Sequence, residues 1–352
     1  MENDASEVAA TLREYAFWLE RDMADTHRIK AYRRSAAVAA ALNPDLTTTP
    51  ATRAQWQELA SFGPSTAAFA AEVAIGGLPP KLAAARFRGS APLDPAGAEL
   101  GSMLLGDLHC HTDASDGGSP MWEMAEVAQR MGRDYLAITD HSPRLRIANG
   151  LTRERLSAQW VEMKRVQKDF DCRLLRGIEV DILADGALDQ ADDMLAGTDI
   201  VVASVHSSLR ADGAIMTRRM VAAVSNPHTL VLGHCTGRHR KSDGTWRPSS
   251  AFDADIVFSA CERFGVAVEI NSRPERQDPP MALLELARDT GCLFAINTDA
   301  HAPGQLDFWS LGAARASKAG IPPERIINTW PEAQLMSHSW RRRPAPRPDV
   351  QV

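Results

Sequence analysis

The sequence has little of what marks a secreted, membrane-bound or covalently acting protein. Its five cysteines form an odd set without a C-x-x-C pair, which indicates reduced thiols in a cytoplasm-like compartment. No apolar run approaches the length of a membrane span, and the polar, acidic N-terminus predicts no signal peptide. Neither a G-x-S-x-G nor a P-loop pattern occurs, so nothing indicates a serine nucleophile or that kind of nucleotide loop. We therefore expect a cytoplasmic protein.

An excess of positive charge is also missing. The chain has 39 Lys and Arg residues against 45 Asp and Glu residues, a formal net charge of −6. Bulk electrostatics therefore do not indicate a nucleic-acid binder, although local patches and bound metal ions can still hold phosphate. Residues 1–88 carry ten basic and ten acidic side chains, an unusually even balance for DNA binding.

The N-terminal part, residues 1–88, has the pattern of a small all-α domain. Residues 5–22, 28–42 and 51–60 are predicted helices, and a Gly-Pro turn separates the last from an alanine-rich helix. A helix that begins after such a turn can offer backbone N–H groups to a phosphate. The alternative is a plain helical bundle with a tight turn.

Residues 89–103 are rich in Gly, Pro and small polar residues, which predicts a linker, and residues 104–335 alternate short apolar runs with helical patterns. Residues 336–352, with an arginine run and three prolines, are predicted to be disordered. The candidate strands are residues 103–108, 135–139, 173–178, 199–204, 230–233, 266–270 and 293–297. Seven β/α units of this length predict an α/β fold with parallel strands, related to the eight-stranded (β/α) barrel.

Every candidate strand ends in a potential metal ligand or amide. His109 and His111 lie two apart after the first strand, so on an extended chain their imidazoles point the same way. Taken alone, such a pair is more often a polar edge than a metal site. The carboxyl ends of barrel strands, however, meet at one rim. The other donors at these ends are Asp116, His141, Glu179, His206, His234, Asp299 and His301.

These donors are too many for one ion, at roughly four donors each. We therefore expect two or three divalent metal ions, with zinc, manganese and iron all accepted by mixed imidazole and carboxylate sites. Such a cluster suits phosphate-ester hydrolysis, because one ion activates a water while the others neutralise charge on the phosphate and the leaving group.

At this point the sequence resembles the PHP (polymerase and histidinol phosphatase) domain family. The strings that carry the resemblance are D-L-H-C-H-T-D-A-S-D-G at 107–117, T-D-H-S at 139–142, G-I-E-V-D-I at 177–182, S-V-H-S at 204–207, G-H-C-T-G-R at 233–238 and N-T-D-A-H at 297–301. The resemblance implies a distorted (β/α)7 barrel with a trinuclear metal centre.

The same resemblance implies an arrangement of ligands. The first ion would take His109, His111, Glu179 and Asp299. The second would share Glu179 and add His206 and His234, and the third would take Asp116, His141 and His301.

Residue roles follow from these assignments. We expect catalytic roles for Glu179, Asp299 and His206. Substrate contacts are expected from Arg238, Asn271, Arg273 and Arg276, because a guanidinium or amide can donate to phosphate oxygens.

Within the family, the amino-acid sequence around these motifs resembles that of the PHP domain of bacterial family X DNA polymerases. Residues 1–88 resemble their first, helix-hairpin-helix domain. Two departures matter. The predicted linker stands where a polymerase palm would lie, so polymerisation is not expected. The helix after the Gly-Pro turn, residues 67–75, has no lysine, so we do not expect Schiff-base lyase activity.

The prediction is therefore a metal-dependent phosphoesterase that acts on DNA 3′ ends, as a 3′–5′ exonuclease or a 3′-phosphatase. One alternative is a small-molecule phosphatase of the histidinol-phosphate type. Another is a non-catalytic DNA-repair adaptor, against which the complete donor set argues. The expected partner is a phosphate-ester substrate, and the wording of the motifs favours a DNA end. No membrane partner is expected, and a monomer is assumed.

Overall fold

The structure is a computed structural model that describes residues 4–42, 49–241 and 243–341. It divides into two compact units, Met1–Pro92 and Leu93–Val352. Within the described residues, no helix is both long and apolar enough to cross a membrane. The five cysteines all lie among the described residues, are buried and form no disulfide.

The first unit is entirely helical. Its helices are α1 (Ala5–Arg21), α2 (Thr26–Ala40), α3 (Arg53–Glu58), α4 (Pro64–Ala74) and α5 (Pro80–Arg88). Tyr15, Tyr32 and Phe69 form an aromatic cluster between α1, α2 and α4, with ring centroids 4.7–5.4 Å apart. This cluster holds the helices together around a small apolar core.

The turn between α3 and α4 forms as the sequence predicts. The Gly63 N–H donates to the Thr66 hydroxyl at 3.0 Å, and Pro64 occupies the first turn of α4. Pro is favoured there because its missing N–H would have no partner within the helix. The turn between the two helices is therefore stabilised by a hydrogen bond within the turn itself.

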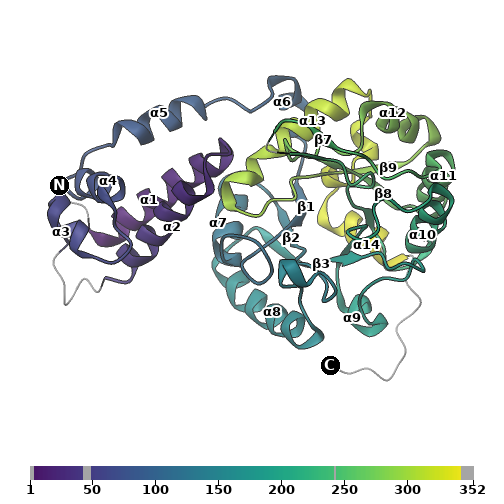
Figure 1. Cartoon of the computed structure of the whole chain (residues 1–352), viewed down its shortest axis with the longest axis horizontal. Helices are drawn as coiled ribbons and strands as arrows, with labels where there is room; N and C mark the ends of the chain where they lie inside the picture. The colour runs from purple at the N-terminus through teal and green to yellow at the C-terminus, as the bar shows by residue number, and fades with distance from the viewer. Residues whose placement is uncertain (1–3, 43–48, 242, 342–352) are drawn as a thin grey trace. The chain divides into compact units, whose positions relative to one another are not determined.

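The second unit is built on one seven-stranded parallel sheet in the order β1-β2-β3-β4-β5-β8-β9. A bridge from Cys110 to Ala300 joins the first strand to the last, so the sheet forms a nearly closed barrel (Figure 1). The strands are β1 (Gly106–Cys110), β2 (Tyr135–Ile138), β3 (Arg173–Asp181), β4 (Ile200–Ser204), β5 (Val231–Leu232), β8 (Ala267–Asn271) and β9 (Leu293–Asn297).

Helices surround the barrel, as the β/α alternation predicts (Figure 1). They are α7 (Met121–Arg130), α8 (Arg153–Val166), α9 (Asp192–Gly197), α10 (Gly213–Ser225), α11 (Ala254–Phe264), α12 (Met281–Thr290), α13 (Trp309–Lys318) and α14 (Glu332–Arg341). Strand side chains alternate between two apolar clusters: Val201 packs in one with Met216 of α10, and Val202 packs in the other with Leu335 of α14. The sheet is therefore covered on both faces.

Two segments differ from the sequence prediction. The predicted linker, 89–103, contains a 3-10 turn (Pro95–Gly97) and α6 (Ala98–Gly101). They lie against α13, where a Cβ at Gly97 would come within 2.1 Å of the Ser310 carbonyl oxygen, so only glycine fits. Most of the linker therefore belongs to the barrel unit.

The predicted disordered tail, 336–352, is helical in its first part. α14 runs to Arg341, Met336 is buried in a barrel cluster, and the Ser339 hydroxyl donates to the Asp199 carbonyl oxygen at 2.8 Å. These contacts order a segment whose arginines and prolines predicted otherwise. The rest of that prediction, 342–352, lies outside the described residues.

Candidate metal centre

The donor side chains come from the carboxyl ends of the barrel strands. His109 lies within β1 and His111 directly after it, while Glu179 lies inside β3, which runs three residues beyond the predicted end. His206 and His234 follow β4 and β5 at a distance of two residues. Because these strands are parallel neighbours, the side chains converge on one rim.

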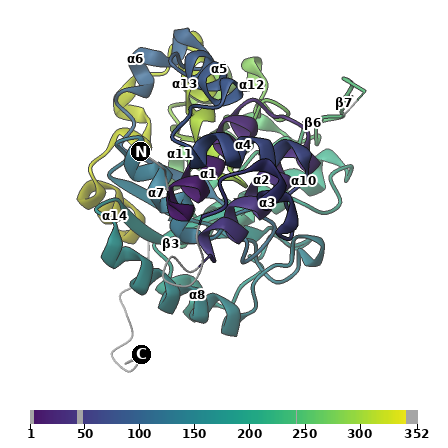
Figure 2. The same ribbon diagram turned by 90° about the vertical axis from the view of Figure 1, so that its left-hand side faces the viewer.

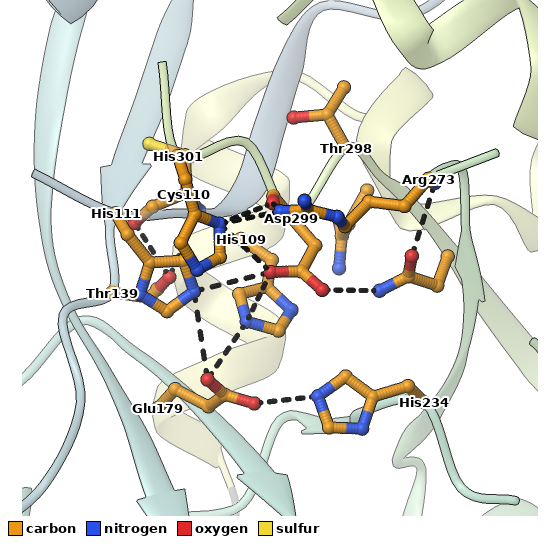
Figure 3. Close-up of polar contacts among 12 residues, drawn as sticks. His109, Cys110, His111, Thr139, Glu179, His234, Arg273, Thr298, Asp299 and His301 are labelled. Carbon is orange, nitrogen blue, oxygen red and sulfur yellow. Dashed lines mark hydrogen bonds and ion pairs between the residues drawn. The ribbon is translucent and has the colours of Figure 1, made fainter. Parts of the chain in front are cut away.

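Glu179 is fully buried, and Figure 3 shows its carboxylate between His111 and His109 on one side and His234 on the other. Its Oε2 is 3.3 Å from His109 Nε2, 3.6 Å from His111 Nε2 and 2.9 Å from His141 Nδ1. Its other oxygen, Oε1, faces the opposite side of the cluster. The two remaining imidazoles there are those of His206, at 3.3 Å, and His234, at 2.9 Å.

Asp299 completes the first group of donors. Its Oδ1 is 3.4 Å from His111 Nε2 and 4.0 Å from His109 Nε2. Asp299 has a positive φ of 51°, a conformation that Asp tolerates better than most residues and that is common at functional sites. The preceding residue is fixed, because the Thr298 N–H donates to the buried Asp107 carboxylate at 3.1 Å.

Asp116 is the least buried of the donors. Its Oδ2 is 3.5 Å from the Nε2 atoms of both His141 and His301. The turn that brings it there depends on Gly117, where a Cβ would come within 2.7 Å of the Thr112 backbone. Asp116 therefore lies at the open side of the cluster, next to His111.

Three sets of side chains offer ligand atoms within 4.8 Å of one another. They are His109, His111 and Asp299; His111, Asp116, His141 and His301; and His141, Glu179 and His206. This grouping differs from the predicted one. Glu179 groups with His141 and His206 and not with His109, while His111 belongs to two of the sets. His234 is in none of them, although its Nε2 is 2.9 Å from Glu179 Oε1.

The donor set fits divalent metal ions. Several buried ligand atoms have no hydrogen-bond partner, which is costly for polar groups out of water. They are His109 Nε2, both ring nitrogens of His111, His141 Nδ1, Glu179 Oε2 and His234 Nδ1. Neutral imidazoles and carboxylates are the donors that zinc, manganese and iron share.

The charges in the cluster suit metal binding. Burial opposes protonation of His109, but the carboxylates of Glu269 and Glu179 outweigh it and raise the pKa of His109 well above its ordinary value. Against the cost of burial, the charge on His109 holds the pKa of Glu179 well below its ordinary value. Burial and the charge of His301 lower the pKa of His111 to about 3. Glu179 and His111 are thus already in the forms that bind metals, an ionised carboxylate and a neutral imidazole, whereas His109 would release its proton when an ion binds.

Two carboxylates that support the donors were not predicted. Glu269 of β8 contacts His109 Nδ1 at 2.6 Å, and Asp181 of β3 contacts His206 Nδ1 at 2.5 Å. A carboxylate on the second ring nitrogen fixes the tautomer of a ligating histidine and raises its basicity. The available signal was strand alternation, because Glu269 and Asn271, like Glu179 and Asp181, are two apart on one strand.

Two family models match the sequence. A model of the PHP domain matches residues 107–235, and a model of a helix-hairpin-helix domain matches residues 3–77. The chain carries a PHP domain. The first match includes all the donors described above except Asp299 and His301. These two donors, and the supporting Glu269, follow the matched segment in the same barrel.

Curated relatives carry two kinds of name. The chain is 39% identical over 231 residues to "DNA polymerase/3'-5' exonuclease PolX" of Bacillus subtilis, covering 65% of this chain and 40% of that protein. It is 29% identical over 242 residues to a "Probable phosphatase" of Shewanella sediminis, covering 66% of this chain and 92% of that protein. The chain thus spans less than half the length of the Bacillus subtilis protein.

A solved structure also matches the barrel. The histidinol phosphate phosphatase of Lactococcus lactis, solved with zinc, L-histidinol and phosphate, aligns with a TM-score of 0.43 and 16% identity. The alignment covers 62% of this chain and 94% of that chain. The PHP domain and the names of the curated relatives support a metal-dependent phosphoesterase hydrolase of the PHP type.

Arg273 and Arg276 of the PHP domain lie beside the donors. Arg276 Nε is 2.9 Å from Asp299 Oδ2, and Arg273 Nη1 is 2.7 Å from His301 Nδ1 and 2.9 Å from the Asp299 carbonyl oxygen. Arg273 also donates to Glu275 at 2.8 Å. Both guanidinium groups, predicted to bind substrate, therefore border the metal centre.

Asn271 and Arg238, also predicted to bind substrate, lie in different surroundings. Asn271 is fully buried, and its amide donates to Glu269 at 3.1 Å and to Asp299 at 3.0 Å, so it holds two carboxylates of the cluster. Arg238 stacks on Trp246 and lines a pocket of about 620 Å³ with residues of α12 and α13. No contact of Arg238 with the donors is found among the described residues.

Proposed function

We propose that this protein hydrolyses phosphate esters at DNA 3′ ends, as a 3′–5′ exonuclease or a 3′-phosphatase, with two or three divalent ions of zinc, manganese or iron. The observation that carries the phosphoesterase part is the convergence of nine His, Asp and Glu donors, with Glu179 among them, several of whose buried ligand atoms have no hydrogen-bond partner. The helix-hairpin-helix match and the relative named as a 3'-5' exonuclease support the DNA part.

The proposed ligand roles follow the positions of the side chains. Glu179 has imidazoles on both sides of its carboxylate, so it is suited to bridge two ions. Asp116, His141 and His301 would hold a further ion at the open side, where His111 is also near. When bound, the ions supply a water of lowered pKa and neutralise phosphate charge. Of the three predicted catalytic residues, Glu179 and Asp299 would act as metal ligands. His206 points toward the same cluster, and Asp181 fixes its imidazole through Nδ1.

Substrate binding is assigned to Arg273 and Arg276. Their guanidinium groups border Asp299 and His301 and are held by ion pairs, so their donors are already oriented before a substrate arrives. Such groups bind phosphate oxygens through charge-assisted hydrogen bonds. They would hold the phosphodiester with its leaving oxygen toward the donors.

A direct test compares substrates. The purified full chain with Mn²⁺ would be given 5′-labelled DNA oligonucleotides with and without a 3′ phosphate, p-nitrophenyl phosphate and histidinol phosphate in separate reactions, with His109→Ala as control. We expect a ladder of shortened DNA, or loss of a 3′ phosphate, that the variant does not produce. Intact DNA together with hydrolysis of the small esters would overturn the DNA proposal and leave the phosphoesterase.

That second outcome corresponds to the other candidate, a small-molecule phosphatase. Two observations favour it: the probable phosphatases match over 92% of their length in the Shewanella case, and residues 1–88 have no net excess of basic side chains. In that case the helical unit would have no part in substrate choice.

A further inference from the structure

A small β-hairpin next to the metal centre has no part in the donor set. Its strands, β6 (His239–Arg240) and β7 (Trp246–Arg247), pair in antiparallel fashion. It lies in the connection between β5 and α11, which begins at the carboxyl end of β5 with His234. In Figure 2 it projects from the body of the barrel unit. The hairpin therefore belongs to the rim that carries the donors.

The hairpin is strongly basic. Arg238 and Lys241 extend the positive charge of its strand residues, which include Arg240 and Arg247. Its one acidic residue, Asp243, is engaged locally, since it accepts hydrogen bonds from the Thr245 N–H at 2.9 Å and hydroxyl at 2.7 Å. An excess of cations on a surface that projects into solvent is attractive to a polyanion.

The hairpin also presents a large aromatic side chain. Trp246 is 39% exposed, and the guanidinium carbon of Arg238 lies 3.9 Å from the centroid of its ring. One face of the indole is thus covered by a stacked cation, and part of the side chain remains exposed to solvent. Arg247 ties the base of the hairpin by donating from Nε to the Gly237 carbonyl oxygen at 2.9 Å. The ring is therefore held in place before any partner binds.

The hairpin continues into the donor-side arginines. The Arg240 N–H donates to the Glu275 carbonyl oxygen at 2.7 Å, and the Glu275 carboxylate pairs with Arg273. Arg273 and Arg276 in turn contact His301 and Asp299. Glu275 thus joins the hairpin to the two arginines that border the donors.

We propose that this hairpin binds the single-stranded terminal part of a DNA substrate, with a base stacked on Trp246 and phosphates on Arg240 and Lys241. Cationic side chains along a backbone and an aromatic ring for a base are the two elements of single-strand recognition without sequence preference. The inference rests on the proposed function, and it identifies what would make the site prefer polynucleotides to small esters.

The test uses full-length variants and two substrates. Trp246→Ala should lower the ratio of kcat/KM for a 5′-labelled single-stranded oligonucleotide to kcat/KM for p-nitrophenyl phosphate by about tenfold, mainly through KM, because one base would have no aromatic ring to stack on. Trp246→Phe should restore most of the ratio, since it retains an aromatic face. Trp340→Ala, at another exposed tryptophan, is the matched control and should leave the ratio unchanged.

A charge variant gives an independent measurement. Arg240→Ala should weaken the salt dependence of the oligonucleotide KM, because one cation fewer neutralises the phosphates. The slope of log KM against log salt concentration should fall by about 0.7, the value for one phosphate of a single strand. If the unaltered protein shortens DNA while Trp246→Ala keeps the same ratio, the hairpin inference is overturned and the proposed function stands. If the unaltered protein hydrolyses only small esters, both are overturned.

Discussion

The two units of this chain treat their charged side chains in opposite ways. In the helical unit, Arg33 holds the buried Glu20 at 2.7 Å, and Arg86 pairs with Glu14 on the surface. In the barrel unit, imidazoles and carboxylates gather in one buried place, and several of their ligand atoms have no hydrogen-bond partner. These ionic groups of the first unit thus satisfy one another, whereas the second unit leaves coordination sites that metal ions would satisfy.

The largest expected effect comes from the centre of the cluster. Glu179→Ala should lower phosphoesterase activity about a thousandfold or more, because it removes a buried carboxylate suited to bridge two ions. Loss of these ions would remove several kcal/mol of charge stabilisation from the transition state. Elemental analysis of the variant should show two ions fewer per chain. Glu285→Ala, at an exposed position of α12, is the control. Metal content equal to that of the unaltered protein would rule out the bridging role.

A smaller effect on metal binding is expected from Glu269, which contacts a donor side chain and is not itself a predicted ligand. Glu269→Gln keeps the shape of the side chain but removes the charge that faces His109 Nδ1 at 2.6 Å. Metal affinity should fall about 10- to 100-fold, as is usual when a ligating histidine is deprived of its carboxylate partner. Competition with a fluorescent chelator measures the change. An affinity within about twofold of the unaltered protein would show that Glu269 does not support His109.

The strands illustrate what the sequence could predict. Buried parallel strands are nearly continuous apolar runs, so all seven were found within a few residues of their true bounds. The predicted 103–108 is displaced from β1 (Gly106–Cys110) because apolar residues continue between α6 and the strand. β3 runs to Asp181 because its last residues pair with β4, and this pairing is not visible in one segment alone.

The helices α6 and α14 were missed for a related reason. Composition predicted a linker and a disordered tail there, but Leu100 and Leu335 are buried against distant parts of the barrel. Tertiary burial decides such short helices, since a segment of this length has little helical stability of its own.

The site shows the same limit. The donors could be predicted as one group, because the parallel strands of a barrel place their carboxyl ends at one rim. The sequence could not distinguish a side chain that faces substrate from one that supports a donor. Asn271 was expected to bind substrate, and the structure adds that its amide also holds Asp299. Arg238 was expected to bind substrate too, but its contact with Trp246 could not be foreseen, because the hairpin that carries Trp246 was not among the predicted elements.

The smallest expected effect lies in the helical unit and separates its two kinds of ion pair. Arg33→Ala should lower the free energy of unfolding by about 2 kcal/mol, because it leaves the buried Glu20 without its guanidinium partner. Arg86→Ala removes an exposed pair and should cost less than about 1 kcal/mol. Urea denaturation followed by circular dichroism measures both. Neither variant should change the metal content, and equal costs would contradict the distinction between the two pairs.

Bound metal ions in the barrel are the central claim, and the metal content of the unaltered chain tests it directly. Purified full-length protein, loaded with Mn²⁺ or Zn²⁺ and freed of excess metal, would be analysed for bound metal per chain. We predict two or three ions per chain. A chelator should remove the ions and abolish hydrolysis, and reloading the protein with metal should restore both. A chain that retains no stoichiometric metal, or that hydrolyses phosphate esters equally well without it, would contradict the metal centre.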